Sequence, residues 1–174
     1  MISPLQRPAR LLLLHDRFTR VEFGLAGVAL TVLLGAYLFE VVSRYAFGAP
    51  TRWTSDLVQY MLCASVALAL PLVAREGGHV AITSFIDKLR AGPRTRVARG
   101  IACVGAAVLG GTTLLFAQVS LDQARQGIET VAAFAIPKWW LTGVATLGLL
   151  DSTLHLLRQG VGWGPLQIGQ ELDL

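Results

Sequence analysis

The chain has 174 residues, of which 15% are charged and 53% are hydrophobic, and its formal net charge is +4 at pH 7. Soluble domains carry charge on about 25% of their residues, and disordered chains combine low hydrophobicity with high net charge. The composition therefore excludes a disordered chain and argues against a free cytosolic globule, and the mean hydropathy of +0.57 favours a protein that faces lipid.

Four apolar runs are long enough to cross a membrane, because about 30 Å of hydrocarbon takes about 20 helical residues. They lack the amphipathic periodicity that marks the surface helices of a soluble protein. The runs lie at approximately 23–47, 57–74, 100–121 and 136–157. The sequence therefore predicts an all-α integral membrane protein with four transmembrane helices, forming one domain over residues 1–174.

Lysine and arginine fall mostly on one side of these runs. Eleven lie on the side of the two termini: Arg7, Arg10, Arg17, Arg20, Arg75, Lys88, Arg90, Arg94, Arg96, Arg99 and Arg158. Four lie on the opposite side: Arg44, Arg52, Arg125 and Lys138. Because cytoplasmic loops are enriched in these residues, we expect both termini in the cytoplasm. The attraction of basic residues to the inner leaflet explains the positive charge, so no nucleic-acid partner is expected.

Two segments outside the runs are expected to lie on the membrane surface. Before residue 23, only Leu11–Leu14 are consecutive leucines, which is too few for the apolar region of a cleaved signal peptide. We therefore expect a cytoplasmic arm that lies on the membrane as an amphipathic helix. After the second run, Ile82, Phe85, Ile86 and Leu89 recur at helical spacing and predict a second interfacial helix.

Ionisable side chains inside the runs need a reason, because each costs roughly 2.5–3.5 kcal/mol at the bilayer centre. Glu40 and Arg44 share one helix face, either as an interfacial ion pair or as a contact with another membrane protein. Asp56 opens the second run, where Thr54 or Ser55 would cap the helix and Asp56 would meet the positive end of its dipole.

Asp151 and His155 form a further pair four residues apart, in the fourth run. They are expected to face a partner helix or a water-filled crevice. A proton relay would need other carboxylates at a matching depth, and Glu40 near the opposite side is the only other acid inside a run, so no relay is expected. Cys63 and Cys103 belong to no CxxC motif and are expected to be small buried residues, without a metal site.

Small residues recur every four positions in two of the runs. They are Gly27, Thr31 and Gly35 in the first, and Ala102, Ala106 and Gly110 in the third. Such spacing permits close helix approach, either within the chain or against a partner.

Three short motifs follow one another along the chain. They read Arg44-Tyr45-x-Phe47-Gly48-x-Pro50-x-x-Trp53-x-x-Asp56-Leu57, then Arg75-Glu76-Gly77-Gly78-His79-Val80, then Ile136-Pro137-Lys138-Trp139. In this order, over about residues 20–158, they resemble the small membrane subunit (DctQ type) of tripartite ATP-independent periplasmic (TRAP) transporters. The chain departs from that pattern at Ser55-Asp56, where the family often has two acidic residues.

The resemblance implies a non-enzymatic, multi-pass protein of the bacterial inner membrane that needs no cofactor. In such systems a periplasmic solute-binding protein delivers an organic anion, often a carboxylate, to a large ion-coupled membrane subunit (DctM type). The small subunit is expected to brace the large one in the bilayer during this symport. The candidate structural or partner-contact residues, none of them catalytic, are Glu40, Arg44, Tyr45, Trp53, Asp56, Arg75, Glu76, Gly77, Gly78, His79, Pro137, Trp139 and Asp151.

The runs themselves lack the inverted repeat and the paired broken helices of a transport pathway. The alternative function is a four-helix membrane anchor that binds haem or quinone, which histidines in apolar helices would suggest. Only His155 lies in a run, whereas His15 and His79 belong to cytoplasmic segments. Ligation by two histidines across the bundle is therefore not expected.

Overall fold

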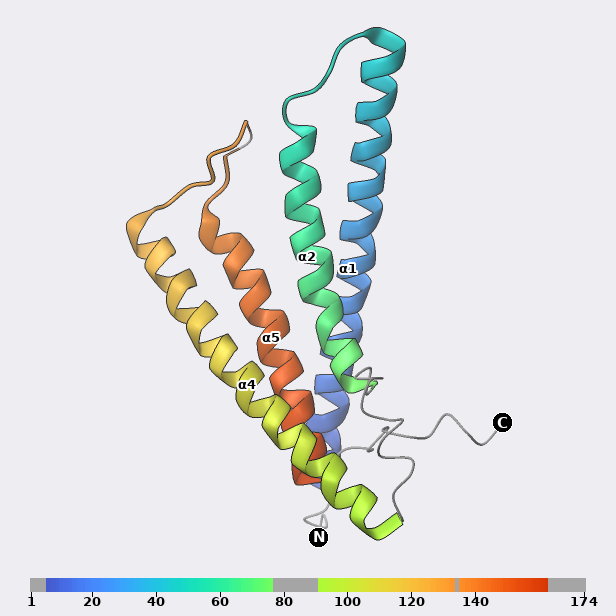
Figure 1. The fold of residues 1–174 in the computed structure, drawn as a ribbon, viewed down its shortest axis with the longest axis vertical. Helices are drawn as coiled ribbons and strands as arrows, with labels where there is room; N and C mark the ends of the chain where they lie inside the picture. Colours follow the sequence, from blue (N-terminus) through green and yellow to red (C-terminus); the bar gives the residue numbers. More distant parts are fainter. Residues whose placement is uncertain (1–5, 77–90, 134, 163–174) are drawn as a thin grey trace, which may run out of the picture.

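The computed structural model describes residues 6–76, 91–133 and 135–162. They form four helices, namely α1 (Gln6–Phe47), α2 (Thr54–Arg75), α4 (Ala91–Gln126) and α5 (Lys138–Val161). The predicted all-helical class is confirmed, since these ranges contain no strand beyond an isolated bridge between Glu129 and Pro137. The helices alternate in direction, so that α1 and α4 begin, and α2 and α5 end, at the same end of the bundle (Figure 1).

The helices pack as a row in the order α1, α2, α5, α4, because α2 contacts both α1 and α5, and α5 contacts α4. The α1–α2 pair and the α5–α4 pair diverge towards the end that carries the loops 48–53 and 127–137 (Figure 1). We call this the wide end, and the opposite end, where α1 begins and α2 and α5 end, the narrow end.

Three helices of the described chain are long and apolar enough to cross a membrane, over Leu12–Phe47, Thr54–Arg75 and Arg96–Gln126. Large hydrophobic side chains remain exposed along all three of these segments. The chain is therefore a multi-pass membrane protein. The fourth helix, α5, is not among the three, because its buried face is polar and carries Asp151, Ser152, Thr153, His155 and Gln159.

The expected surface arm before residue 23 is wrong for the described residues. The segment continues the axis of α1, which runs without a break for 42 residues, or about 63 Å at about 1.5 Å per residue. Thr19 and Glu22 lie on the same helix face as Ala26, and their exposed fractions are only 0% and 3%. This face packs against other helices, so the segment is part of the helix bundle and does not form a separate helix. The interfacial helix expected over 82–89 lies outside the described residues.

The buried seam of α1 recurs at intervals of mostly three and four residues. It consists of Thr19, Glu22, Ala26, Ala29, Ala36 and Glu40. Alanines in such a seam let two helix backbones approach closely. The stripe of Gly27, Thr31 and Gly35 lies on another face and is exposed, so the close approach expected there is not made within the described chain.

The stripe on α4 does pack within the chain. Ala102 and Ala106 are buried at 3% exposure, and a Cβ atom at Gly110 would lie 3.5 Å from the Thr153 methyl carbon of α5. Both cysteines, Cys63 and Cys103, are free and exposed on the helix surfaces. The expectation that they are buried is therefore wrong, because each sits beside its helix seam rather than in it.

The helices α2 and α5 cross closely at Gly148. A Cβ atom at Gly148 would lie 2.0 Å from the carbonyl oxygen of Ala67, which is far inside contact distance. The missing side chain therefore sets the separation of these two helices. By contrast, a Cβ atom at the exposed Gly111 of α4 would have no heavy atom within 4 Å.

We expect Gly148→Ala to destabilise the purified protein by about 1–3 kcal/mol, because the added methyl group forces α2 and α5 apart. Gly111→Ala is the matched control, since the same change there meets open space. Thermal unfolding in detergent measures both variants. Equal unfolding temperatures for the two variants would contradict the tight crossing.

Candidate functional site

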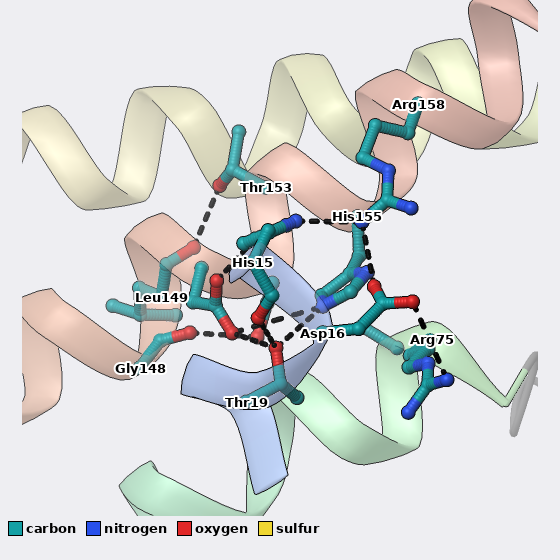
Figure 2. A network of polar contacts seen from close by, with 12 residues as sticks. His15, Asp16, Thr19, Arg75, Gly148, Leu149, Thr153, His155 and Arg158 are labelled. Atoms are coloured by element: carbon teal, nitrogen blue, oxygen red, sulfur yellow. Dashed lines mark hydrogen bonds and ion pairs between the residues drawn. The ribbon is translucent and has the colours of Figure 1, made fainter. Parts of the chain in front are cut away.

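Polar side chains from three helices meet at the narrow end, as Figure 2 shows. We call this cluster the polar junction. It consists of His15, Asp16, Thr19 and Glu22 from α1, Arg75 from α2, and Asp151, His155 and Arg158 from α5. Asp151 and His155 are each only 3% exposed. Because buried polar groups are costly unless they are paired, the contacts within this cluster decide whether the three helices can meet here.

Asp151 lies at the centre of the polar junction and accepts hydrogen bonds from α1 through both carboxylate oxygens. Thr19 donates its hydroxyl to Oδ2 at 2.8 Å, and His15 contacts Oδ1 through Nε2. These bonds cross from residue 151 to a helix more than 130 residues earlier in the chain. Asp151 therefore ties α1 to α5.

The hydrogen-bond pattern fixes the tautomer of His15. The Arg158 guanidinium donates through Nη1 to His15 Nδ1 at 2.7 Å, and a guanidinium can only donate. His15 Nδ1 must therefore carry the lone pair, and Nε2 carries the proton that is directed at Asp151. His15 is thus a neutral imidazole that passes a hydrogen bond from Arg158 on to Asp151.

His155 approaches the same carboxylate through Thr19. Its Nε2 lies 2.8 Å from the Thr19 hydroxyl oxygen, which has a single hydrogen to give. Because Thr19 donates that hydrogen to Asp151, His155 Nε2 is the donor to Thr19. The rings of His155 and His15 are stacked, with centroids 4.2 Å apart and an interplanar angle of 20°.

Asp16 links all three helices at the more exposed edge of the polar junction. It accepts from Arg158 Nη1 at 2.9 Å and forms an ion pair with Arg75 at 3.5 Å (Figure 2). Beside it, the Gln159 amide of α5 donates to the carbonyl oxygens of Ala74 and Arg75, at 3.0 and 3.2 Å. Since the last carbonyls of a helix have no partner within the helix, Gln159 completes the end of α2.

Glu22 is a buried carboxyl group of the polar junction to which no N–H or hydroxyl group of the described residues donates a hydrogen bond. Its side chain is 3% exposed. Its carboxyl group interacts with that of Asp151. The expectation that only Glu40 could accompany Asp151 is therefore wrong, because the continuous α1 brings Glu22 to the same depth.

The polar junction also contains residues of the kinds that bind metal ions. Ligand atoms of His15, Asp151 and His155 all lie within 4.8 Å of one another. His15 meets His155 across the bundle, although it was expected in a separate cytoplasmic segment, because α1 carries it onto α5. One sequence pattern could have revealed this contact. His15, Thr19 and Glu22 are spaced by four and three residues, so they lie on the same helix face as the buried Ala26 of the apolar run.

A second polar cluster closes the wide end. Glu40 accepts a hydrogen bond from Arg44 at 2.7 Å, so the two residues form an ion pair as their spacing predicts. Glu40 also accepts from the backbone N–H of Thr51 at 3.0 Å and from the Thr51 hydroxyl. It thereby holds the loop between α1 and α2, while the Arg44 side chain stays 57% exposed.

Asp56 lies in the first turn of α2 and accepts from the backbone N–H of Ala133, at 2.8 Å. Tyr60, one turn further, donates to the Thr130 hydroxyl at 2.8 Å. Both contacts attach α2 to the loop before α5. Capping by Thr54 or Ser55 is wrong, because α2 begins at Thr54 after Trp53, with no side-chain cap bond among the described residues.

The remaining candidate residues are dispersed. Tyr45, Trp53 and Trp139 are exposed, with exposed fractions of 83%, 43% and 42%. Pro137 precedes α5, and Glu76 follows α2 and donates its N–H to Leu72. Gly77, Gly78 and His79 lie outside the described residues. The structure thus gathers Arg75 and Asp151 at the narrow end and leaves the other described candidates near the wide end or at helix ends.

We expect Thr19→Val to destabilise the protein by about 1–3 kcal/mol, because it keeps the side-chain shape but removes the hydroxyl that bonds Asp151 Oδ2 and His155 Nε2. Thr31→Val is the control on the same helix, since that hydroxyl is exposed and only bonds back to Gly27. Thermal unfolding in detergent compares them. Destabilisation by Thr31→Val equal to that by Thr19→Val would contradict the role of Thr19.

Comparison with known families matches this chain to one transporter component. The family model of the tripartite ATP-independent periplasmic transporters, DctQ component, matches residues 33–163. This range holds the α5 side of the polar junction, whereas the contributing residues of α1 precede it. A search of curated proteins found no match. Because the matched range covers well over half of the chain, the protein belongs to the DctQ family of TRAP transporter components.

Proposed function

We propose that this chain is the small membrane subunit that braces the large, ion-coupled subunit of a TRAP transporter. It would cross the bacterial inner membrane four times with both termini in the cytoplasm. The transporter would import an organic anion, often a carboxylate, delivered by a periplasmic binding protein. Membership of the DctQ family supports the subunit type. The bracing role, the orientation and the partners are the proposal.

The observation that carries the bracing role is the distribution of ionisable residues. Residues 23–39, 57–74, 100–121 and 139–150 contain no Asp, Glu, Lys, Arg or His. Ion-coupled pathways through membranes are marked by ionisable groups inside the bilayer. In the described chain the buried charges gather at the narrow and wide ends, where they tie helices and loops together. Such an arrangement favours a structural role for this chain over a transport pathway through it.

The positive charges support the orientation. At the narrow end the described chain presents Arg17, Arg20, Arg75, Arg96, Arg99 and Arg158. The wide end presents Arg44, Arg52, Arg125 and Lys138. The excess at the narrow end favours its placement in the cytoplasm. The wide end, with its exposed aromatic residues, would then face the periplasm, where a binding protein docks.

The polar composition of α5 is compatible with a fourth span. Its polar residues face α1, α2 and α4 and not the surrounding lipid, since Asp151, Ser152 and His155 are buried. A helix enclosed in this way does not need apolar side chains on every face to lie within a membrane. The haem anchor gains nothing from the two histidines, because their rings are stacked 4.2 Å apart and no porphyrin fits between them.

We expect this chain to co-purify in mild detergent with a large multi-span subunit, and its deletion to abolish uptake of the solute. Reconstitution in liposomes measures both parts of the prediction. The large subunit with the binding protein should need this chain for transport, while this chain alone should move no solute. Uptake by this chain alone, or full uptake without it, would overturn the proposal.

We expect Arg44→Ala to lower the recovered complex several-fold. Its half-exposed guanidinium lies at the edge of the apolar surface, where a partner would hold it. The isolated chain should unfold at an unchanged temperature, because Glu40 keeps both contacts with Thr51. Arg125→Ala, at an exposed site at the same end, is the control and should leave recovery unchanged. Equal recovery of the two variants would contradict the contact.

A further inference from the structure

We propose that the polar junction binds one divalent transition-metal ion. The ligands would be His15 of α1 and Asp151 and His155 of α5, with Glu22 of α1 as the fourth. This role goes beyond the bracing function and does not depend on it. It rests on the composition of the cluster, its burial and the contact between the buried carboxyl groups of Glu22 and Asp151.

The donor set is one that divalent transition metals prefer. Two imidazoles and a carboxylate bind zinc or ferrous iron, and Asp151 and His155, four residues apart, face the same side of α5. Tetrahedral zinc has ligand bonds of about 2.0–2.1 Å, which places its ligand atoms about 3.3 Å apart. The ligand atoms here lie within 4.8 Å of one another, so an ion would draw the three side chains together and displace the Thr19 hydroxyl, which lies 2.8 Å from both Asp151 Oδ2 and His155 Nε2.

Glu22 is the independent observation that points to a cation. Its side chain is buried at 3% exposure, its carboxyl group contacts that of Asp151, and no N–H or hydroxyl group of the described residues donates to its oxygens. Buried carboxylates are normally paired or bind metals. Two buried carboxyl groups in contact are stabilised either by a proton between them or by a cation, so a metal ion would take the place of that proton.

Metal binding would exchange one tautomer of His15 for the other. In the structure Nε2 carries the proton, because Arg158 donates to Nδ1. Ligation through Nε2 requires its lone pair, so the proton moves to Nδ1 and Arg158 gives up that contact. Arg158 retains Asp16, to which it already donates at 2.9 Å. His155 would likewise need its proton on Nδ1 in order to ligate through Nε2, and it would give up its bond to Thr19. The ion pairs of Asp16 with Arg75 and Arg158 stay in place.

A route for the ion leads in from the narrow end. The side chains of Asp16 and Arg75 are 25% and 28% exposed, and that of His15 is 17% exposed, whereas Asp151 is 3% exposed. Exposure thus falls stepwise from the solvent side to the centre of the cluster. Once bound, the ion would join α1 to α5 more firmly than the hydrogen bonds do.

The test uses the full chain, purified in detergent, treated with EDTA and then titrated with Zn²⁺. We expect one zinc ion per chain to remain after desalting, as measured by elemental mass spectrometry, and a rise in the unfolding temperature. Substituting Co²⁺ should give the visible absorption of a tetrahedral site. His15→Ala and Glu22→Gln should each weaken binding at least ten-fold. His79→Ala, which removes the third histidine of the chain, should bind as the unsubstituted protein does.

Retention of no zinc by the unsubstituted protein would overturn the proposal and leave the cluster as a proton-bearing hydrogen-bond network. Loss of zinc in His79→Ala with retention in His15→Ala would overturn it as well. Glu22→Gln keeps the size of the side chain, and its amide can still donate a hydrogen bond to Asp151, so we expect this variant to fold. Unchanged zinc affinity of folded Glu22→Gln would remove Glu22 from the ligand set and overturn the four-ligand site.

Discussion

A single buried carboxylate organises the narrow end of this protein. Asp151 accepts hydrogen bonds from two residues of α1, and its neighbours connect it through Arg158 and Asp16 to Arg75 of α2. A charge at this burial is tolerated only when its partners are complete. The requirement explains why α1 cannot stop at the membrane surface. Its first turns must run alongside α5 to supply those partners, and α5 can then be polar where it is enclosed.

Between the two polar ends, the helices are held together by close packing of small side chains. The alanine seam of α1, the small residues of α4 and the glycine of α5 at the Ala67 crossing allow backbones to come close without any side-chain interlock. In lipid, burial of apolar surface adds little stability. The close backbone contacts therefore stabilise the bundle through van der Waals attraction, and the hydrogen bonds of the polar clusters determine how the helices are oriented. The narrow and wide ends thus fix which helices are neighbours, and the small residues fix how closely they pack.

The helical class and the approximate positions of three apolar spans could be predicted from the sequence, because long apolar runs have few alternative structures in a membrane. The Glu40–Arg44 pair also followed from its spacing, since both residues lie on one helix. The polar junction could not be predicted, because its members are far apart in the chain and meet only after α1 packs on α5. His15, Thr19 and Glu22 were assigned to a surface arm. Their shared spacing with the buried Ala26 was the available signal.

The unbroken course of α1 has a mechanical consequence. The helix is anchored near its start by Thr19 and near its finish by Glu40, and no proline or hinge lies between these anchors. A rigid rod fastened at two distant points cannot tilt at one without straining the other. Any torque that a neighbouring protein applies to the lipid-facing side of α1 would therefore be shared between both faces of the membrane.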